Sequence, residues 1–295
     1  MNMSHIPELE LKTIEEIKRL SARQAINIKI NEEKRPKLTD SKFGGMPYWD
    51  ISMEYPKKSD GTLLMLLAQI NLDKLNMEGM NIDNRLPQGG MLQFFIDARD
   101  DVYGVDFDYM KDNSGNLKQD GFRVIYHKVV NYAVLEEEIK GLGMPISTDE
   151  DMEESPIWGE YGLDIQMKET YISMDDYRFD QYFCAAAKKV GWSINENENC
   201  YNQFSKAGSD LLYKELDSSG HWILGYPYFT QTDPRTDIER FNKSYNVQLF
   251  QMDSDFGNKN DYIMWGDSGV ANFFISENDL ANEVFTDILY SWDCC

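Results

Sequence analysis

Two short stretches of the sequence carry residue types whose spacing could do chemistry. GDSG at 266–269 has the pattern of a serine nucleophile, and DSDFGNKND at 253–261 places oxygen ligands at alternate positions, as a calcium loop does. A nucleophilic serine needs a histidine to take its proton and an acid to orient it, but none of His5, His127 and His221 stands in such a context. The calcium-like stretch lacks the glycine and the final acid of such loops. Both stretches are therefore interpreted as turns, with a weak cation site at 253–261 as the alternative that stays open.

Cofactor and metal fingerprints are missing as well. The sequence contains neither the glycine-rich phosphate loop nor the glycine-rich dinucleotide turn, and its four cysteines form no paired metal-binding pattern. We therefore predict no cofactor and no metal site. Whether the protein is an enzyme stays open at this stage.

The sequence motifs around these turns occur twice in the chain. Three pairs of motifs match in order: FGGMPYW at 43–49 with ILGYPYF at 223–229, LLAQIN at 66–71 with QLFQMD at 248–253, and LPQGGMLQFFI at 86–96 with WGDSGVANFFI at 265–275. Their offsets are 180, 182 and 179 residues. A nearly constant offset over three separate motifs indicates an internal duplication. The first copy reads PQGG where the second reads GDSG, so a turn explains both copies and a nucleophile only one.

Each copy places a glutamine, Gln69 or Gln251, inside an apolar strand. A buried amide costs about 1–3 kcal/mol unless its hydrogen bonds are made, so we expect both side chains to bond backbone groups or each other. The functional alternative is a ligand contact in a cleft between the copies. The candidate ligand-binding residues for such a cleft are Gln69, Gln88, Asp253, Asp267 and Trp265. The tandem Phe pairs place one ring on each face of a strand, so both faces of the sheet should be covered.

The charge balance limits the possible partners. The chain has 29 basic and 51 acidic residues, a net charge of −22. Nucleic acids and anionic membranes are bound mainly through Lys and Arg, so we predict neither as a partner. One interpretation is that this negative charge keeps the protein soluble in the cytosol. The more specific alternative is that it attracts a basic protein partner. No signal peptide and no run of about 18–20 apolar residues occurs, which favours a soluble, cytoplasmic protein.

Three segments have the pattern of helices, in contrast to the strand and turn patterns of the rest of the chain. Residues 7–20 are amphipathic, 173–191 begin at Ser173 and end at Gly191, and 276–292 form a final helix capped by Ser276. Short apolar runs between turn clusters fill most of 47–126 and return after residue 221, which is typical of strands.

The motifs FGGMPYW, LLAQINLDKL, LPQGGMLQFF, LGYP and WGDSGVANFFI also resemble, in that order, the YwqG-like family of bacterial proteins over about residues 41–292. The resemblance implies a soluble, duplicated, β-rich α+β fold. The family is of unknown function, and it offers no catalytic residue that could be carried over to this sequence.

Together these observations predict a single α+β domain over residues 1–295 with approximate two-fold pseudo-symmetry. It consists of a first β-rich repeat at 41–130, a helical connecting insertion at 131–220, and a second β-rich repeat with a C-terminal helix at 221–295. Helices at both ends are expected to cover the outside. The favoured function is non-enzymatic binding of a basic protein partner. The alternative is an enzyme or small-ligand protein with its site between the repeats.

Overall fold

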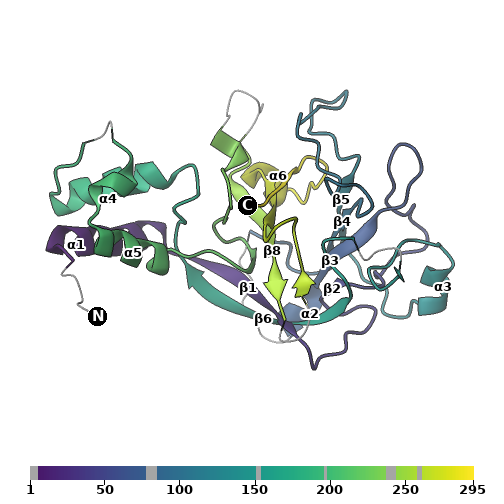
Figure 1. Cartoon of the computed structure of the whole chain (residues 1–295). Helices are drawn as coiled ribbons and strands as arrows, with labels where there is room; N and C mark the ends of the chain where they lie inside the picture. The colour runs from purple at the N-terminus through teal and green to yellow at the C-terminus, as the bar shows by residue number, and fades with distance from the viewer. Residues whose placement is uncertain (1–5, 78–84, 151–153, 196–197, 237–243, 258–260) are drawn as a thin grey trace.

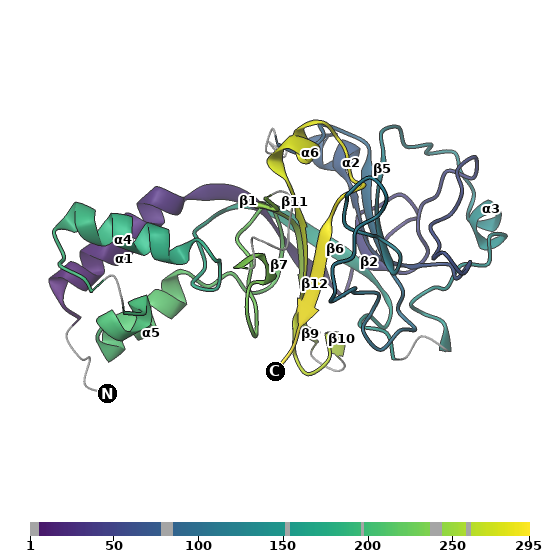
Figure 2. The same cartoon turned by 90° about the horizontal axis from the view of Figure 1, so that it is seen from above.

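The computed structural model describes residues 6–77, 85–150, 154–195, 198–236, 244–257 and 261–295. In this part of the chain, ten strands form one antiparallel sheet in the order β12-β11-β8-β7-β1-β6-β2-β3-β4-β5, which curls into a nearly closed barrel (Figures 1 and 2). The predicted β-rich α+β class is confirmed. None of the helices described has the length and apolar composition that a membrane crossing requires.

The strands of the sheet are β1 (Arg23–Asn31), β2 (Lys42–Gly44), β3 (Met65–Asn71), β4 (Met91–Ile96), β5 (Phe122–His127), β6 (Glu160–Thr170), β7 (His221–Ile223), β8 (Val247–Asp253), β11 (Val270–Ile275) and β12 (Leu289–Asp293). A separate hairpin consists of β9 (Asp255–Phe256) and β10 (Asp261–Ile263). The helices are α1 (Glu8–Ser21), α2 (Leu72–Met77), α3 (Glu136–Lys140), α4 (Phe179–Val190), α5 (Lys206–Glu215) and α6 (Glu277–Ala281). The shorter 3-10 turns cover Cys200–Gln203 and Pro234–Thr236.

The long ribbon of β1 and β6 forms the middle of the sheet and leads to a helical unit at one side. Figures 1 and 2 show α1, α4 and α5 set apart from the barrel, with β1 and β6 running from them into the sheet. The two strands pair over nine residues, from Arg23 with Thr170 to Asn31 with Gly162. Leu163, Ile165 and Met167 of β6 pack on the barrel core, and the polar residues alternate with them.

The sheet has four strands on each side of this ribbon, and the two sets match. β2, β3, β4 and β5 follow on one side (the first half), and β7, β8, β11 and β12 follow in the same order on the other (the second half). The pairing of β3 with β4 has a bulge that skips Leu67, and the pairing of β8 with β11 has one that skips Leu249, 182 residues later. The predicted repeats therefore contribute to one sheet, a point that the sequence left open.

Aromatic rings from both halves fill the barrel. Phe94 of β4 packs against Phe250 of β8 at 4.5 Å and against Phe273 of β11 at 5.1 Å between ring centroids. The next rings along, Phe95 and Phe274, lie on the other face of the sheet and are also fully buried. The expectation that both faces are covered is confirmed, and burial of this aromatic area stabilises the barrel.

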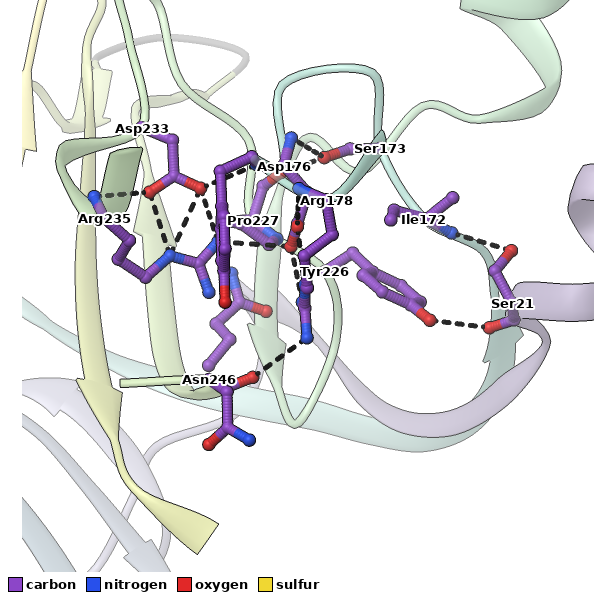
Figure 3. Close-up of polar contacts among 12 residues, drawn as sticks. Ser21, Ile172, Ser173, Asp176, Arg178, Tyr226, Pro227, Asp233, Arg235 and Asn246 are labelled. Carbon is purple, nitrogen blue, oxygen red and sulfur yellow. Dashed lines mark hydrogen bonds and ion pairs between the residues drawn. The ribbon is translucent and has the colours of Figure 1, made fainter. Parts of the chain in front are cut away.

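A buried ionic network joins the helical unit to the barrel (Figure 3). Arg235 bonds Asp233 through Nε and Nη2 at 2.8 and 2.6 Å and reaches Asp176 at 3.1 Å. Arg178 makes a second pair with Asp176 at 2.6 Å. Burial opposes the charged form of Asp176, but the two arginines outweigh it and hold the pKa of this carboxyl below its usual range. All four charges are compensated within the network, so we interpret it as structural.

Three sequence-based expectations about elements are wrong. The predicted C-terminal helix ends at Ala281, and Leu289–Asp293 form strand β12, because pairing with β11 outweighs the helical spacing of the apolar residues. The helix expected from Ser173 begins only at Phe179, because Asp176 and Arg178 serve the ionic network instead. The segment 131–220 is not purely helical, since it contains the eleven-residue strand β6.

Candidate functional site

The two buried glutamines of the sequence analysis hold matching loops. Gln69 Oε1 accepts from Tyr48 N at 2.9 Å, and its Nε2 donates to the carbonyls of Leu38 and Asp40, both at 2.7 Å. Gln251 repeats this pattern with Tyr228 N, Ser218 O and Gly220 O, all at 2.8 Å and each 180 residues after its counterpart. The prediction that both amides bond backbone groups is confirmed. Gln69 is fully buried and faces these loops.

The other candidate residues lie in different places. Trp265 is fully buried in the barrel core against Tyr103, at 5.6 Å between rings. Asp267 is exposed in the turn that holds Ser268, and Gln88 lines a hollow of about 550 Å³ beside α6. Asp253 lines another hollow, at the end of β8. The structure thus does not bring the five candidates together.

The turn at Ser268 has no catalytic surroundings in the part of the chain that the structure describes. The ring of His127 contacts Gln93 at 2.8 Å, and the ring of His221 contacts Asp255 at 3.2 Å. Ser268 is exposed and is bonded to neither histidine. His5 lies outside the described residues. These contacts agree with the interpretation of GDSG as a turn.

The hollow beside Asp253 is the most polar candidate site, and we call it the acidic hollow. It measures about 620 Å³ and opens where the short strand β7 leaves the edge of β1 uncovered. Its lining includes three carboxylates and three aromatic rings: Glu32, Asp253, Asp255, Trp222, Phe256 and Tyr262. Asn27, Lys29, Lys168 and His221 also line it.

The carboxylate of Asp253 is only partly compensated. It accepts from Gly220 N at 2.7 Å and from Ser254 N at 2.9 Å, and it forms no ion pair with any lysine or arginine that the structure describes. Burial raises the pKa of Asp253, and these two N–H groups and nearby His221 offset this only in part. A cation in the hollow would supply the missing compensation.

Asn27 provides a second unsatisfied acceptor in the same hollow. The residue is 6% exposed, and its Oδ1 receives no hydrogen bond from any described residue. Its Nδ2 makes a long contact of 3.4 Å to His221 O. An unmade hydrogen bond of this kind costs about 1–3 kcal/mol of stability.

His221 positions the acidic residues and is not free to act as a base. Its Nδ1 accepts from Asp253 N at 3.1 Å, which leaves the proton on Nε2, and Nε2 then donates to Asp255 at 3.2 Å. Both ring nitrogens are thus engaged. General base catalysis needs a free nitrogen within reach of the substrate proton, so this geometry favours binding over chemistry.

The first half of the sheet has a different set of residues at the matching place. Ser41 Oγ accepts from Asn71 N at 2.9 Å, as His221 Nδ1 accepts from Asp253 N. The serine and asparagine of the first half thus correspond to a histidine and an aspartate in the second. The histidine and aspartate of the acidic hollow are therefore absent from the matching place in the first half, whereas the glutamine contacts occur in both halves.

The sequence analysis named Asp253 as a candidate and did not single out Asn27 or Glu32, which line the same hollow. The hydroxyl of Tyr262 donates to the carboxylate of Glu32, which lies 230 residues earlier in the chain. The one available signal for Asn27 was a polar residue inside the apolar start of β1. The calcium-like stretch forms the hairpin of β9 and β10, with 258–260 outside the described residues, and the described part holds no cluster of ligands fit for a metal ion.

Comparison with known proteins places the chain in a family. No curated protein matches it in a sequence search. A family model described as a domain of unknown function, DUF1963, matches residues 41–294, which include every strand of the sheet except β1. This chain belongs to the DUF1963 family of domains of unknown function.

Proposed function

We propose that this chain is a non-enzymatic binding protein whose acidic hollow receives a cationic side chain from a basic partner. The observation that carries the proposal is the partly compensated Asp253 carboxylate, whose hollow is also lined by Asn27 with its unsatisfied Oδ1. The carboxylate oxygens of Asp253 and the Oδ1 of Asn27 can accept hydrogen bonds but cannot donate them. An alkylammonium or guanidinium group carries only donors and a positive charge, so it complements them.

The aromatic lining supports the same ligand class. Phe256 is 56% exposed, Trp222 is almost fully buried, and Tyr262 lies beside Tyr161 at 5.1 Å between rings. Aromatic faces attract cations by about 0.5–2 kcal/mol and also cover the alkyl stem of a lysine or arginine. The acids of the lining outnumber its two lysines, Lys29 and Lys168. A net charge of −22 steers a basic partner toward the whole surface.

The internal duplication belongs to this proposal. It is supported by the matched bulges at Leu67 and Leu249 and by the matched contacts of Gln69 and Gln251. On this view the two halves kept their glutamine frame, and the second acquired a binding site. The single domain, the YwqG-like naming and a cytoplasmic location remain predictions, the last supported by the four cysteines, none of which is in a disulfide in the described part of the chain.

Calorimetric titration with a lysine hexapeptide tests the proposal. We expect the wild type to bind it with an affinity that falls as salt rises, and the D253N/D255N variant to bind it at least about tenfold more weakly. The matched control is D108N/E137Q, which removes the same charge from two exposed positions remote from the hollow. Equal weakening by both double variants would mean that only net charge matters, and the proposed site would be wrong.

A further inference from the structure

A second hollow of about 480 Å³ lies against the central ribbon and shares Lys29 with the acidic hollow. It is lined by three lysines, Lys29, Lys34 and Lys74, together with Asp40, Asp164 and Ser41. We call it the lysine hollow. In a chain with 51 acidic and 29 basic residues, a hollow in which the lysines outnumber the acids is unusual.

Most of the charges in the lysine hollow already have partners. Lys74 pairs with Asp40 at 2.5 Å. Lys34 donates to Leu163 O at 2.6 Å and lies 3.9 Å from Asp164, which also accepts from Asn31 at 2.9 Å. Both acids are thus engaged with other donors.

Lys29 is the exception. Its ammonium makes no ion pair or hydrogen bond with any residue in the described part of the chain, and its side chain is exposed. It stands directly opposite Asp164 in the register of β1 and β6, at the middle of the ribbon. Ser41 lines the same hollow from just before the start of β2, on the other side of β6. Its oxygen accepts from Asn71 N at 2.9 Å, which leaves the hydroxyl proton available to a ligand.

We infer that the lysine hollow binds a carboxylate, held by the ammonium of Lys29 and the hydroxyl of Ser41. Both groups offer hydrogens, and an ionised carboxylate accepts only. This inference extends the proposed function. If the proposed function holds, the partner places a basic side chain in the acidic hollow and an acidic group in the lysine hollow. A carboxylate at Lys29 also neutralises a positive charge beside the site for the cation.

The carboxylate site is tested first without any peptide. In an NMR titration with acetate against chloride at constant ionic strength, we expect saturable shifts of the backbone amides of 163–166 and of Ser41. K29Q should weaken this binding about tenfold, whereas K12Q, which removes a lysine from α1, should leave it unchanged. Shifts that never saturate, or saturate equally in K29Q, would overturn the inference. Tighter, Lys29-dependent binding of inorganic phosphate would overturn the carboxylate assignment.

A peptide pair separates this inference from the proposed function. We expect a peptide with lysine and glutamate to bind more tightly than its lysine and glutamine counterpart, and K29Q to abolish the difference. D253N/D255N should weaken both peptides while acetate binding persists. If acetate binds and neither peptide does, the proposed function fails and the carboxylate site stands. If both peptides bind equally to the wild type, the assignment of the acidic group fails.

Discussion

Replacing the two buried glutamines tests the framework on which the site is built. Gln69→Leu removes the partners of Tyr48 N and of the carbonyls of Leu38 and Asp40. Each buried group left without a hydrogen bond costs about 1–3 kcal/mol, and the loop retains some access to water. We therefore expect the free energy of unfolding to fall by about 3–5 kcal/mol.

Gln251→Leu is the matched variant, because it removes the same three kinds of contact from the second half. Its cost should agree with that of Gln69→Leu within about 1 kcal/mol, measured by urea denaturation followed by circular dichroism. Gln88→Leu serves as control, since Gln88 is exposed, and it should cost less than about 0.5 kcal/mol. A loss below about 1 kcal/mol for either buried glutamine would refute the reasoning.

Two further predictions concern buried charges. Burial lowers the pKa of His127 to about 4 from a usual value near 6.5, so the folded state binds this proton less well than the unfolded state. The contribution of His127 to the free energy of unfolding is therefore fully present above about pH 6.5 and falls by about 3 kcal/mol as the pH drops toward 4. In urea denaturation at a series of pH values, H127Q should lose less stability than the wild type over this range. Arg235→Met leaves the carboxylates of Asp233 and Asp176 short of a buried partner, so it should cost about 3–5 kcal/mol in the same assay. R235M/D233N should recover part of that loss, and no recovery would contradict the ionic-network account.

Much of the barrel was predictable from the sequence because similar motifs occur at two places in the chain. The strands that became β3, β4, β8 and β11 were all expected, and so were backbone bonds for Gln69 and Gln251. These features depend on local patterns: apolar runs, turn residues and a repeated polar residue. Such local patterns can be interpreted without knowledge of the tertiary structure.

The elements that the sequence analysis missed are those decided by distant partners. Leu289–Asp293 could be spaced as a helix, and only the neighbouring β11 makes them a strand. The alternation of Leu163, Ile165 and Met167 with polar residues was a readable strand signal for β6, and it was overlooked between the predicted repeats. The acidic hollow was missed for a similar reason, since Glu32 and Tyr262 of the β9–β10 hairpin lie 230 residues apart in the chain and meet only in the folded structure.

The pKa of Asp253 tests the central claim most directly. Burial raises this pKa in the free protein, and an ammonium or guanidinium in the hollow favours the ionised carboxylate. Peptide binding should therefore strengthen as the pH rises through the pKa of the free protein, because binding and deprotonation are linked. NMR titration of the Asp253 side chain, with and without the lysine hexapeptide, should show the pKa falling when the peptide is bound. A pKa that stays the same at saturating peptide would place the cation elsewhere and contradict the account.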